Sequence, residues 1–98
     1  MDVVGLPEFS RSMRSVITNA SDARQVAELL TRLATDHDSV DMQDEQVQIP
    51  GTGIELWATR GLQLSGGEGR VTWRYEERNG YLVIVCFSLV QVDSRLSR

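Results

Sequence analysis

Three arginines recur at even spacing before an Asn-Gly dipeptide, at Arg70, Arg74 and Arg78. Side chains alternate between the two faces of a strand, so this spacing places all three guanidinium groups on one side. The strand predicted after the dipeptide carries Tyr81 and Phe87 on that same side. Arginine forks bind phosphate and exposed rings stack on unpaired bases, so the pattern is typical of a surface that binds RNA.

The same face has two other interpretations. Arg74 and Arg78 could pair with Glu76 or Glu55, which would make this an ordinary solvated surface. Alternatively, Val83 and Val85 are predicted to lie on this face, where another protein or a second copy of the chain could cover them. The residue types alone leave these alternatives open.

An acidic run without any basic residue occupies positions 36–45, and its carboxylates are Asp36, Asp38, Asp41, Asp44 and Glu45. Such a run is a solvated loop or a surface that binds a basic partner protein. His37, the only histidine, lies within it and is expected to be solvated, since no His or Cys stands at zinc-site spacing. Cys86 is expected to be a buried apolar residue, so neither a metal nor a cofactor is predicted.

The composition is that of one globular domain: 98 residues, 41% apolar and 24% charged. The formal net charge of −4 argues against a general nucleic-acid binder. Charge is uneven, because residues 1–50 hold nine acids and four arginines, whereas residues 51–98 hold five acids and six arginines. A single cysteine, no signal peptide and no apolar run of membrane-spanning length predict a cytoplasmic protein without a membrane partner.

Two amphipathic helices are predicted to form an antiparallel hairpin over about residues 6–35. The first covers residues 7–18 and has a proline in its first turn and one apolar stripe. The second should begin at Asp22 as N-cap, because Gln25 stands at capping-box spacing, and end near Thr35.

Short β-rich runs follow an acidic loop at 36–46 and make up a sheet over about residues 47–92; they are predicted at 47–49, 54–60, 62–64, 70–77 and 81–92. Asn79-Gly80 between the last two runs predicts a hairpin tip, because both turn positions need positive φ. The resulting register places Arg78 opposite Tyr81, Glu76 opposite Val83, Arg74 opposite Val85 and Thr72 opposite Phe87.

One face of this hairpin is predicted to be the core face, with side chains Val71, Trp73, Tyr75, Leu82, Ile84 and Cys86. Phe9 and Leu29 from the helix stripes should pack with Trp73 and Ile84. The sequence therefore predicts one α+β domain, residues 1–98. In it, two N-terminal helices pack on a C-terminal antiparallel sheet of three to four strands, followed by a flexible tail at 93–98.

The order of these elements resembles the RelE/ParE toxin superfamily, with the HigB-like branch closest. The resemblance covers roughly residues 6–92 and begins with Leu6-Pro7-Glu8-Phe9 opening a helix. The family's three successive strands are matched by Ile54-Glu55-Leu56-Trp57-Ala58-Thr59-Arg60, Gly69-Arg70-Val71-Thr72-Trp73-Arg74-Tyr75 and Tyr81-Leu82-Val83-Ile84-Val85-Cys86-Phe87.

The resemblance implies the toxin of a bacterial or phage type II toxin–antitoxin pair, or a catalytically weakened relative, that acts on RNA during translation. Arg60, Arg70 and Arg74 would then be the catalytic residues of a metal-independent endoribonuclease. The residues that bind RNA would be Arg78, Tyr81, Phe87 and Arg95. The implied partners are an antitoxin protein and the ribosome with its messenger RNA.

A second hypothesis is a non-catalytic regulator or inhibitor that binds protein, of ParE-like, phage or immunity type. The arginine-bearing face offers no histidine or lysine to transfer a proton, and Tyr81 has an ordinary pKa of about 10. Such a protein would work through its sheet face, through the acidic residues at 36–45, or as a homodimer.

Overall fold

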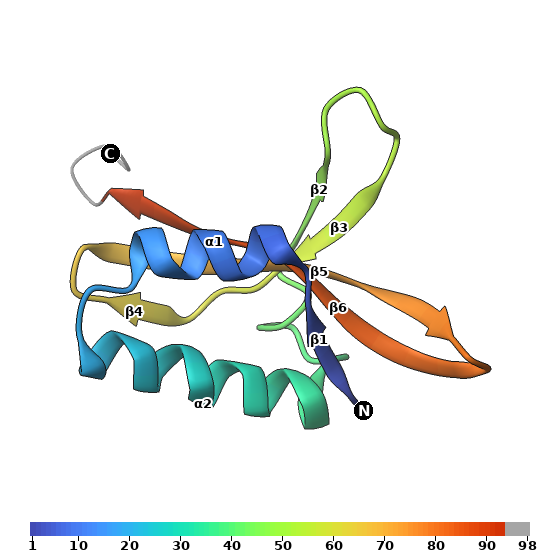
Figure 1. The fold of residues 1–98 in the computed structure, drawn as a ribbon, viewed down its shortest axis with the longest axis horizontal. Helices are drawn as coiled ribbons and strands as arrows, with labels where there is room; N and C mark the ends of the chain where they lie inside the picture. The colour runs from blue at the N-terminus through green and yellow to red at the C-terminus, as the bar shows by residue number, and fades with distance from the viewer. Residues whose placement is uncertain (94–98) are drawn as a thin grey trace.

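The structure, a computed structural model, describes residues 1–93 (Figure 1). Two helices and six strands follow one another along the chain: β1 (Val3–Gly5), α1 (Pro7–Val16), α2 (Ala20–Asp36), β2 (Glu45–Gln48), β3 (Glu55–Ala58), β4 (Leu62–Leu64), β5 (Gly67–Arg78) and β6 (Tyr81–Asp93). All six strands belong to one sheet of order β1-β6-β5-β3-β2, and β4 pairs separately with β5.

The predicted antiparallel sheet of three to four strands is wrong. The sheet has six strands and is mixed, because β1 pairs in parallel with β6, with Val3 opposite Ile84 and Gly5 opposite Cys86. Strand β1 lies outside the predicted range 47–92 and β2 begins two residues before it, while β6 ends one residue beyond it at Asp93. Strands β1 and β2 are short, and strand β1 has no neighbour in sequence, so its pairing depends on a partner some eighty residues away and leaves no local pattern.

The β5–β6 hairpin has its tip at Asn79-Gly80, as predicted, with φ of 52° and 80° at these two residues. The register from Arg78–Tyr81 to Arg74–Val85 is also confirmed. A β-bulge between Thr72 and Trp73 then shifts the pairing, so that Thr72 lies opposite Ser88 and not opposite Phe87. Beyond the bulge, Leu89 is buried opposite Val71 and extends the core.

The N-cap of α2 is Asn19, three residues before the predicted cap. Its side-chain oxygen accepts a hydrogen bond of 2.8 Å from the backbone N–H of Asp22. The carboxylate of Asp22 is buried and accepts hydrogen bonds from the backbone N–H and the hydroxyl of Ser65, at 3.0 and 2.7 Å. Asp22 therefore ties the start of α2 to the turn between β4 and β5, and Asn19 does the capping.

The core lies between the helices and one face of the sheet. Phe9, Leu29, Trp73 and Ile84 are buried in a single cluster, which confirms the predicted core contact. Leu82, which was expected on the same face, is 53% exposed because it lies at the projecting tip of the hairpin. The cluster is completed by residues from α2, the 37–44 segment, β4, β5 and β6: Val26, Leu33, Met42, Leu62, Leu64, Val71, Cys86 and Leu89.

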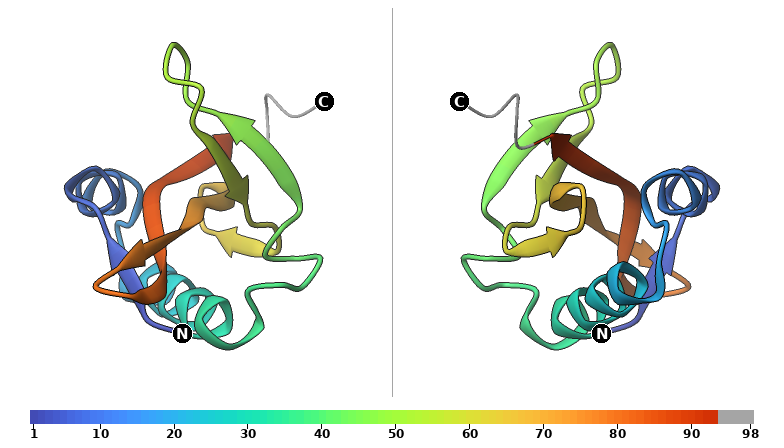
Figure 2. Two further views of the ribbon diagram at one scale, coloured as in Figure 1. Left: turned by 90° about the vertical axis from the view of Figure 1, so that its right-hand side faces the viewer. Right: turned by 90° about the vertical axis from the view of Figure 1, so that its left-hand side faces the viewer.

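The two helices run antiparallel but pack on different strands. Helix α1 lies against β6, where the hydroxyl of Ser12 accepts a 2.8 Å hydrogen bond from the backbone N–H of Leu89. Helix α2 packs against β4. Seen end-on, the helices are separate cylinders, and the β2–β3 hairpin projects away from them (Figure 2). In the part of the chain that the structure describes, no helix is long and apolar enough to cross a membrane.

Candidate functional site

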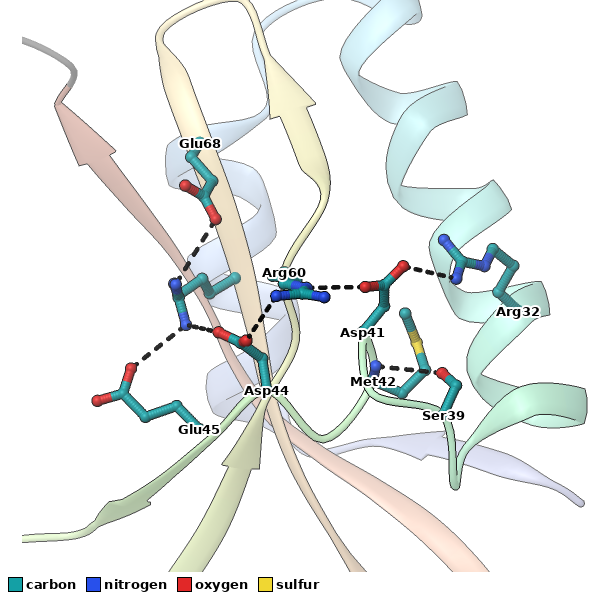
Figure 3. Close-up of polar contacts among 9 residues, drawn as sticks. Arg32, Ser39, Asp41, Met42, Asp44, Glu45, Arg60 and Glu68 are labelled. Atoms are coloured by element: carbon teal, nitrogen blue, oxygen red, sulfur yellow. Dashed lines mark hydrogen bonds and ion pairs between the residues drawn. The ribbon is translucent and has the colours of Figure 1, made fainter.

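A continuous set of ion pairs joins the acidic segment to arginines from separate elements (Figure 3). Asp41 lies between Arg32 of α2 and Arg60, which follows β3. Its two carboxylate oxygens are 3.2 Å from Arg32 Nη2 and 2.8 Å from Arg60 Nε. Arg60 also reaches Asp44, with 3.4 Å between Nη1 and Oδ1. Positive and negative groups therefore alternate along this surface.

Arg70 on β5 continues the same set. Its Nη1 lies 3.1 Å from Asp44 Oδ2 and 3.3 Å from Glu45 Oε2, and its Nη2 lies 3.7 Å from Glu68 Oε1. Three carboxylates therefore surround a guanidinium group whose side chain is 26% exposed. A phosphate that approaches this arginine would compete with these carboxylates for its charge.

The ion pairs position the 37–44 segment on the sheet. Backbone hydrogen bonds accompany them, from Arg60 N–H to Asp41 O at 2.9 Å and from Asp44 N–H to Ala58 O at 3.1 Å. Hydrogen bonds from Arg60, and then from Arg32, lower the pKa of the Asp41 carboxyl group. The same hydrogen bond, which Arg60 donates to Asp41, raises the pKa of Arg60. The acidic run and the arginines, expected as separate surfaces, thus form one surface of paired charges named here the ion network: Arg32, Asp41, Asp44, Glu45, Arg60, Glu68 and Arg70.

Two further arginines lie on the opposite side of β5 from the core. Arg74 Nε is 3.1 Å from Glu76 Oε2, and Arg78 Nη2 is 3.5 Å from Glu76 Oε1. The guanidinium carbon of Arg74 lies 5.5 Å from the centre of the Phe87 ring, a cation–π distance. The structure therefore joins Arg74 to Phe87 but also gives both arginines an acidic partner.

The remaining predicted site residues are separate from these groups. Tyr81 is 75% exposed at the hairpin tip. Asp36 lies 4.0 Å from Arg32, at the edge of the ion network, and Asp38 is exposed. Arg95 lies outside the described residues. The valines expected on the second face, Val83 and Val85, are already buried within the chain.

The expectation that His37 is solvated is wrong. Its Nδ1 lies 2.6 Å from the hydroxyl of Tyr75, and the amide of Gln43 donates to both the Tyr75 oxygen and the His37 carbonyl, at 3.3 and 3.1 Å. Burial is the main reason why the pKa of Tyr75 is raised, so its hydroxyl stays protonated and can donate to His37. Nothing in the sequence pairs these residues, because they are 38 positions apart.

Other groups with reactive side chains are few. Burial raises the pKa of the Cys86 thiol to about 12, which keeps it protonated and unreactive. Within residues 1–93, no three or more His, Cys, Asp and Glu side chains are arranged to hold a metal ion. The His37–Tyr75 pair is a proton-transfer candidate inside the described fold, and it lies on the face of β5 opposite to Arg74.

An apolar groove between α1 and α2 was not predicted. It has a volume of about 540 Å³ and is lined by Ser10, Met13, Arg14, Ile17, Ala23, Val26, Ala27 and Leu30. The apolar stripes of the two helices were recognised in the sequence. The separation of the helices was not, because it results from α1 packing against β6 and α2 packing against β4. No sequence signal could have located this groove without that packing.

A second groove, of about 400 Å³, crosses the other face of the sheet. The β2–β3 hairpin forms one wall with Ile49 and Leu56, and the start of α1 forms the other. Its floor includes Thr72 and Ser88, whose hydroxyls lie 2.7 Å apart and satisfy each other. The β-bulge next to Thr72 creates this pairing.

No family model, curated protein or solved structure matches this chain. The resemblance to RelE/ParE toxins therefore stays a prediction, and the function has to be argued from the geometry.

Proposed function

We propose that this chain is a non-catalytic domain that binds another protein, as a regulator or inhibitor, through the groove between α1 and α2. The observation that carries the proposal is the groove itself. It is open and apolar, its volume is about 540 Å³, and no segment of residues 1–93 fills it.

The position of the groove suits a protein partner. Two antiparallel helices form its walls, and partly buried side chains such as Met13, Ile17 and Leu30 form its apolar surface. Apolar side chains in such a groove gain free energy when a partner removes them from water. An amphipathic segment laid between two helices is a common way to cover such a surface.

The charge pattern of the sheet also supports binding without catalysis. Arg60, Arg70, Arg74 and Arg78 all have carboxylate partners within 4.0 Å. Arginine stays protonated near neutral pH, so it cannot itself serve as a general base. The His37–Tyr75 pair could move a proton, but it lies across the sheet from Arg74.

The test uses substitutions that block the groove without entering the core. Ala27 lines the groove and is exposed, so Ala27→Glu should fill and charge it while the helix is preserved. Thr31→Glu is the matched control, since Thr31 is exposed one turn later and does not line the groove. Both variants and the wild type would be used to purify interacting proteins from the native cells.

A partner that is retained by the wild type and by Thr31→Glu, and lost with Ala27→Glu at an unchanged melting temperature, is the expected result. Retention of the same partners by all three proteins would show that the groove is not the binding surface.

A second candidate is the RelE/HigB-like toxin, with an antitoxin partner and a cytoplasmic site of action. The observation in its favour is that Arg60 and Arg70 share Asp44, so two guanidinium groups lie in one place. For a ribosome-dependent nuclease, induction should stop growth and leave cleaved messages, and Arg70→Ala should remove both effects. Growth arrest that persists without message cleavage would exclude the nuclease.

A further inference from the structure

The groove between α1 and α2 carries charge of one sign only. Arg14 is the single charged residue on its lining, and no carboxylate lines it. Arg14 Nε makes a 3.4 Å contact with the carbonyl oxygen of Ser10, one turn earlier in the same helix. A cation on a rim without an acidic neighbour is the feature that an acidic ligand would match.

The arginines elsewhere show that this arrangement is local. Within residues 1–93, arginines on the sheet and at the end of α2 form ion pairs, as does Arg11 with Glu8 at 3.3 Å. Arg14 and Arg24 are the two in this part of the chain without a carboxylate within 4.0 Å. Of these two, Arg14 belongs to the groove lining and Arg24 does not.

The dimensions of the groove indicate the size of its ligand. Its lining runs from Ser10 to Ile17 on one side and from Ala23 to Leu30 on the other. At 1.5 Å per residue this is a length of about 11 Å, or two turns of a helix. A helix of that length presents two or three apolar side chains at i, i+3 or i+4, and i+7 to one surface.

We infer that the groove binds an acidic amphipathic helix of a partner protein, with apolar side chains between α1 and α2 and a carboxylate facing Arg14. This inference rests on the proposed function and adds the chemistry of the partner. The helix covers the apolar surface, and its carboxylate supplies the partner that Arg14 lacks.

The test uses two designed 16-residue helical peptides with leucines at the same i, i+3, i+4 and i+7 positions. One peptide has glutamates at its flanking positions and the other has lysines. Fluorescence anisotropy would measure the Kd of each. The whole chain has a net charge of −4, so non-specific attraction would favour the lysine peptide. At least tenfold tighter binding of the glutamate peptide is the expected result.

Two charge-matched variants locate the effect. Arg14→Glu should weaken binding of the glutamate peptide at least tenfold, while Arg11→Glu, with the same change in net charge, should leave its Kd within about twofold. Arg11 is the suitable control because it is exposed on the same helix, does not line the groove, and pairs with Glu8. Ala27→Glu should abolish binding of the glutamate peptide.

The outcomes separate this inference from the proposed function. Equal binding of both peptides, lost in Ala27→Glu, would leave the groove as a binding site and overturn its preference for acids. No binding of either peptide, or equal effects of the two arginine variants, would overturn the inference, while partner purification with Ala27→Glu still decides the proposed function. Binding to vesicles that contain anionic lipid, or a dimer of the chain that Ala27→Glu dissociates, would assign the groove to another occupant.

Discussion

The ion network and the groove between α1 and α2 differ in whether their exposed side chains have partners within the chain. In the ion network, Arg60 and Arg70 share Asp44, and further carboxylates lie around them. In the groove, apolar side chains face solvent beside Arg14, which has no carboxylate within 4.0 Å among the described residues. The arginines predicted as site residues are thus paired with carboxylates of the same chain, and apolar residues of the two helices form the open surface.

The difference shows that a charged residue type does not by itself mark a binding surface. A guanidinium group surrounded by three carboxylates has lost most of its capacity to bind an external anion. An apolar groove gains free energy from any partner that removes it from water. Interaction should therefore be sought first at the groove, and the ion network should behave as part of the fold.

The largest expected effect is a difference in the free energy of unfolding between substitutions at two adjacent leucines of α2, one in the core and one in the groove. Leu29 is 4% exposed in the core cluster, so Leu29→Ala should lower the free energy of unfolding by about 2–5 kcal/mol. Leu30 lines the groove and is partly buried, so Leu30→Ala should cost roughly 1 kcal/mol. Urea unfolding of both variants measures the difference, and equal losses would show that the groove is part of the core.

A smaller effect is expected when the ion network loses its central carboxylate. Asp44→Asn keeps the shape of the side chain but removes the charge that Arg60 and Arg70 share, and should cost about 1 kcal/mol because these side chains remain partly exposed. Arg14→Gln, in the groove, should leave stability unchanged. Urea unfolding at low and high salt would check both. A loss for Arg14→Gln as large as that for Asp44→Asn would remove the contrast between the two regions.

The His37–Tyr75 contact tests whether polar side chains at the start of the 37–44 segment also have partners within the chain. Tyr75→Phe removes the hydroxyl that contacts His37 and Gln43 and should cost about 0.5–1 kcal/mol. The pKa of Tyr75 is raised in the folded state, so its contribution is present below about pH 10 and is lost as pH rises through the folded pKa. Ultraviolet titration of the wild type should show one tyrosine that ionises later than the other. Two tyrosines that titrate together would contradict the buried contact.

The smallest effect concerns Asp41, which is exposed at the edge of the network. Its pKa is lowered in the folded state, chiefly by the hydrogen bond from Arg60. Its contribution to stability is therefore present above the ordinary carboxyl pKa of about 3.9 and is lost as pH falls through the lower folded value. NMR titration should place the pKa of the Asp41 carboxyl below this ordinary value. In Arg60→Gln the Asp41 value should rise, and an unchanged value would show that the ion pair does not form in solution.

Several features could be predicted from the sequence because their causes are local. The apolar stripes of the helices follow a period of 3.6 residues, which identified Phe9 and Leu29 as core residues. The register of the hairpin was correct from its tip to Arg74 and failed at Thr72, because a bulge has no distinctive residue pattern here. Among the candidate site residues, Arg60 and Arg70 were recognised as special, but their partners in the acidic segment lie 16 to 26 positions away and could not be assigned.

The sequence by itself determined the Asn79-Gly80 hairpin, since positive φ at both turn positions is a property of those two residues and their neighbours. Only the tertiary structure decided the parallel pairing of β1 with β6, the charge balance around Arg70 and the separation of α1 from α2. Each of these depends on groups that meet only after the chain has closed a long loop, so no window of sequence contains both partners. The groove also depends on the tertiary structure, because it lies between one helix that packs against β6 and another that packs against β4.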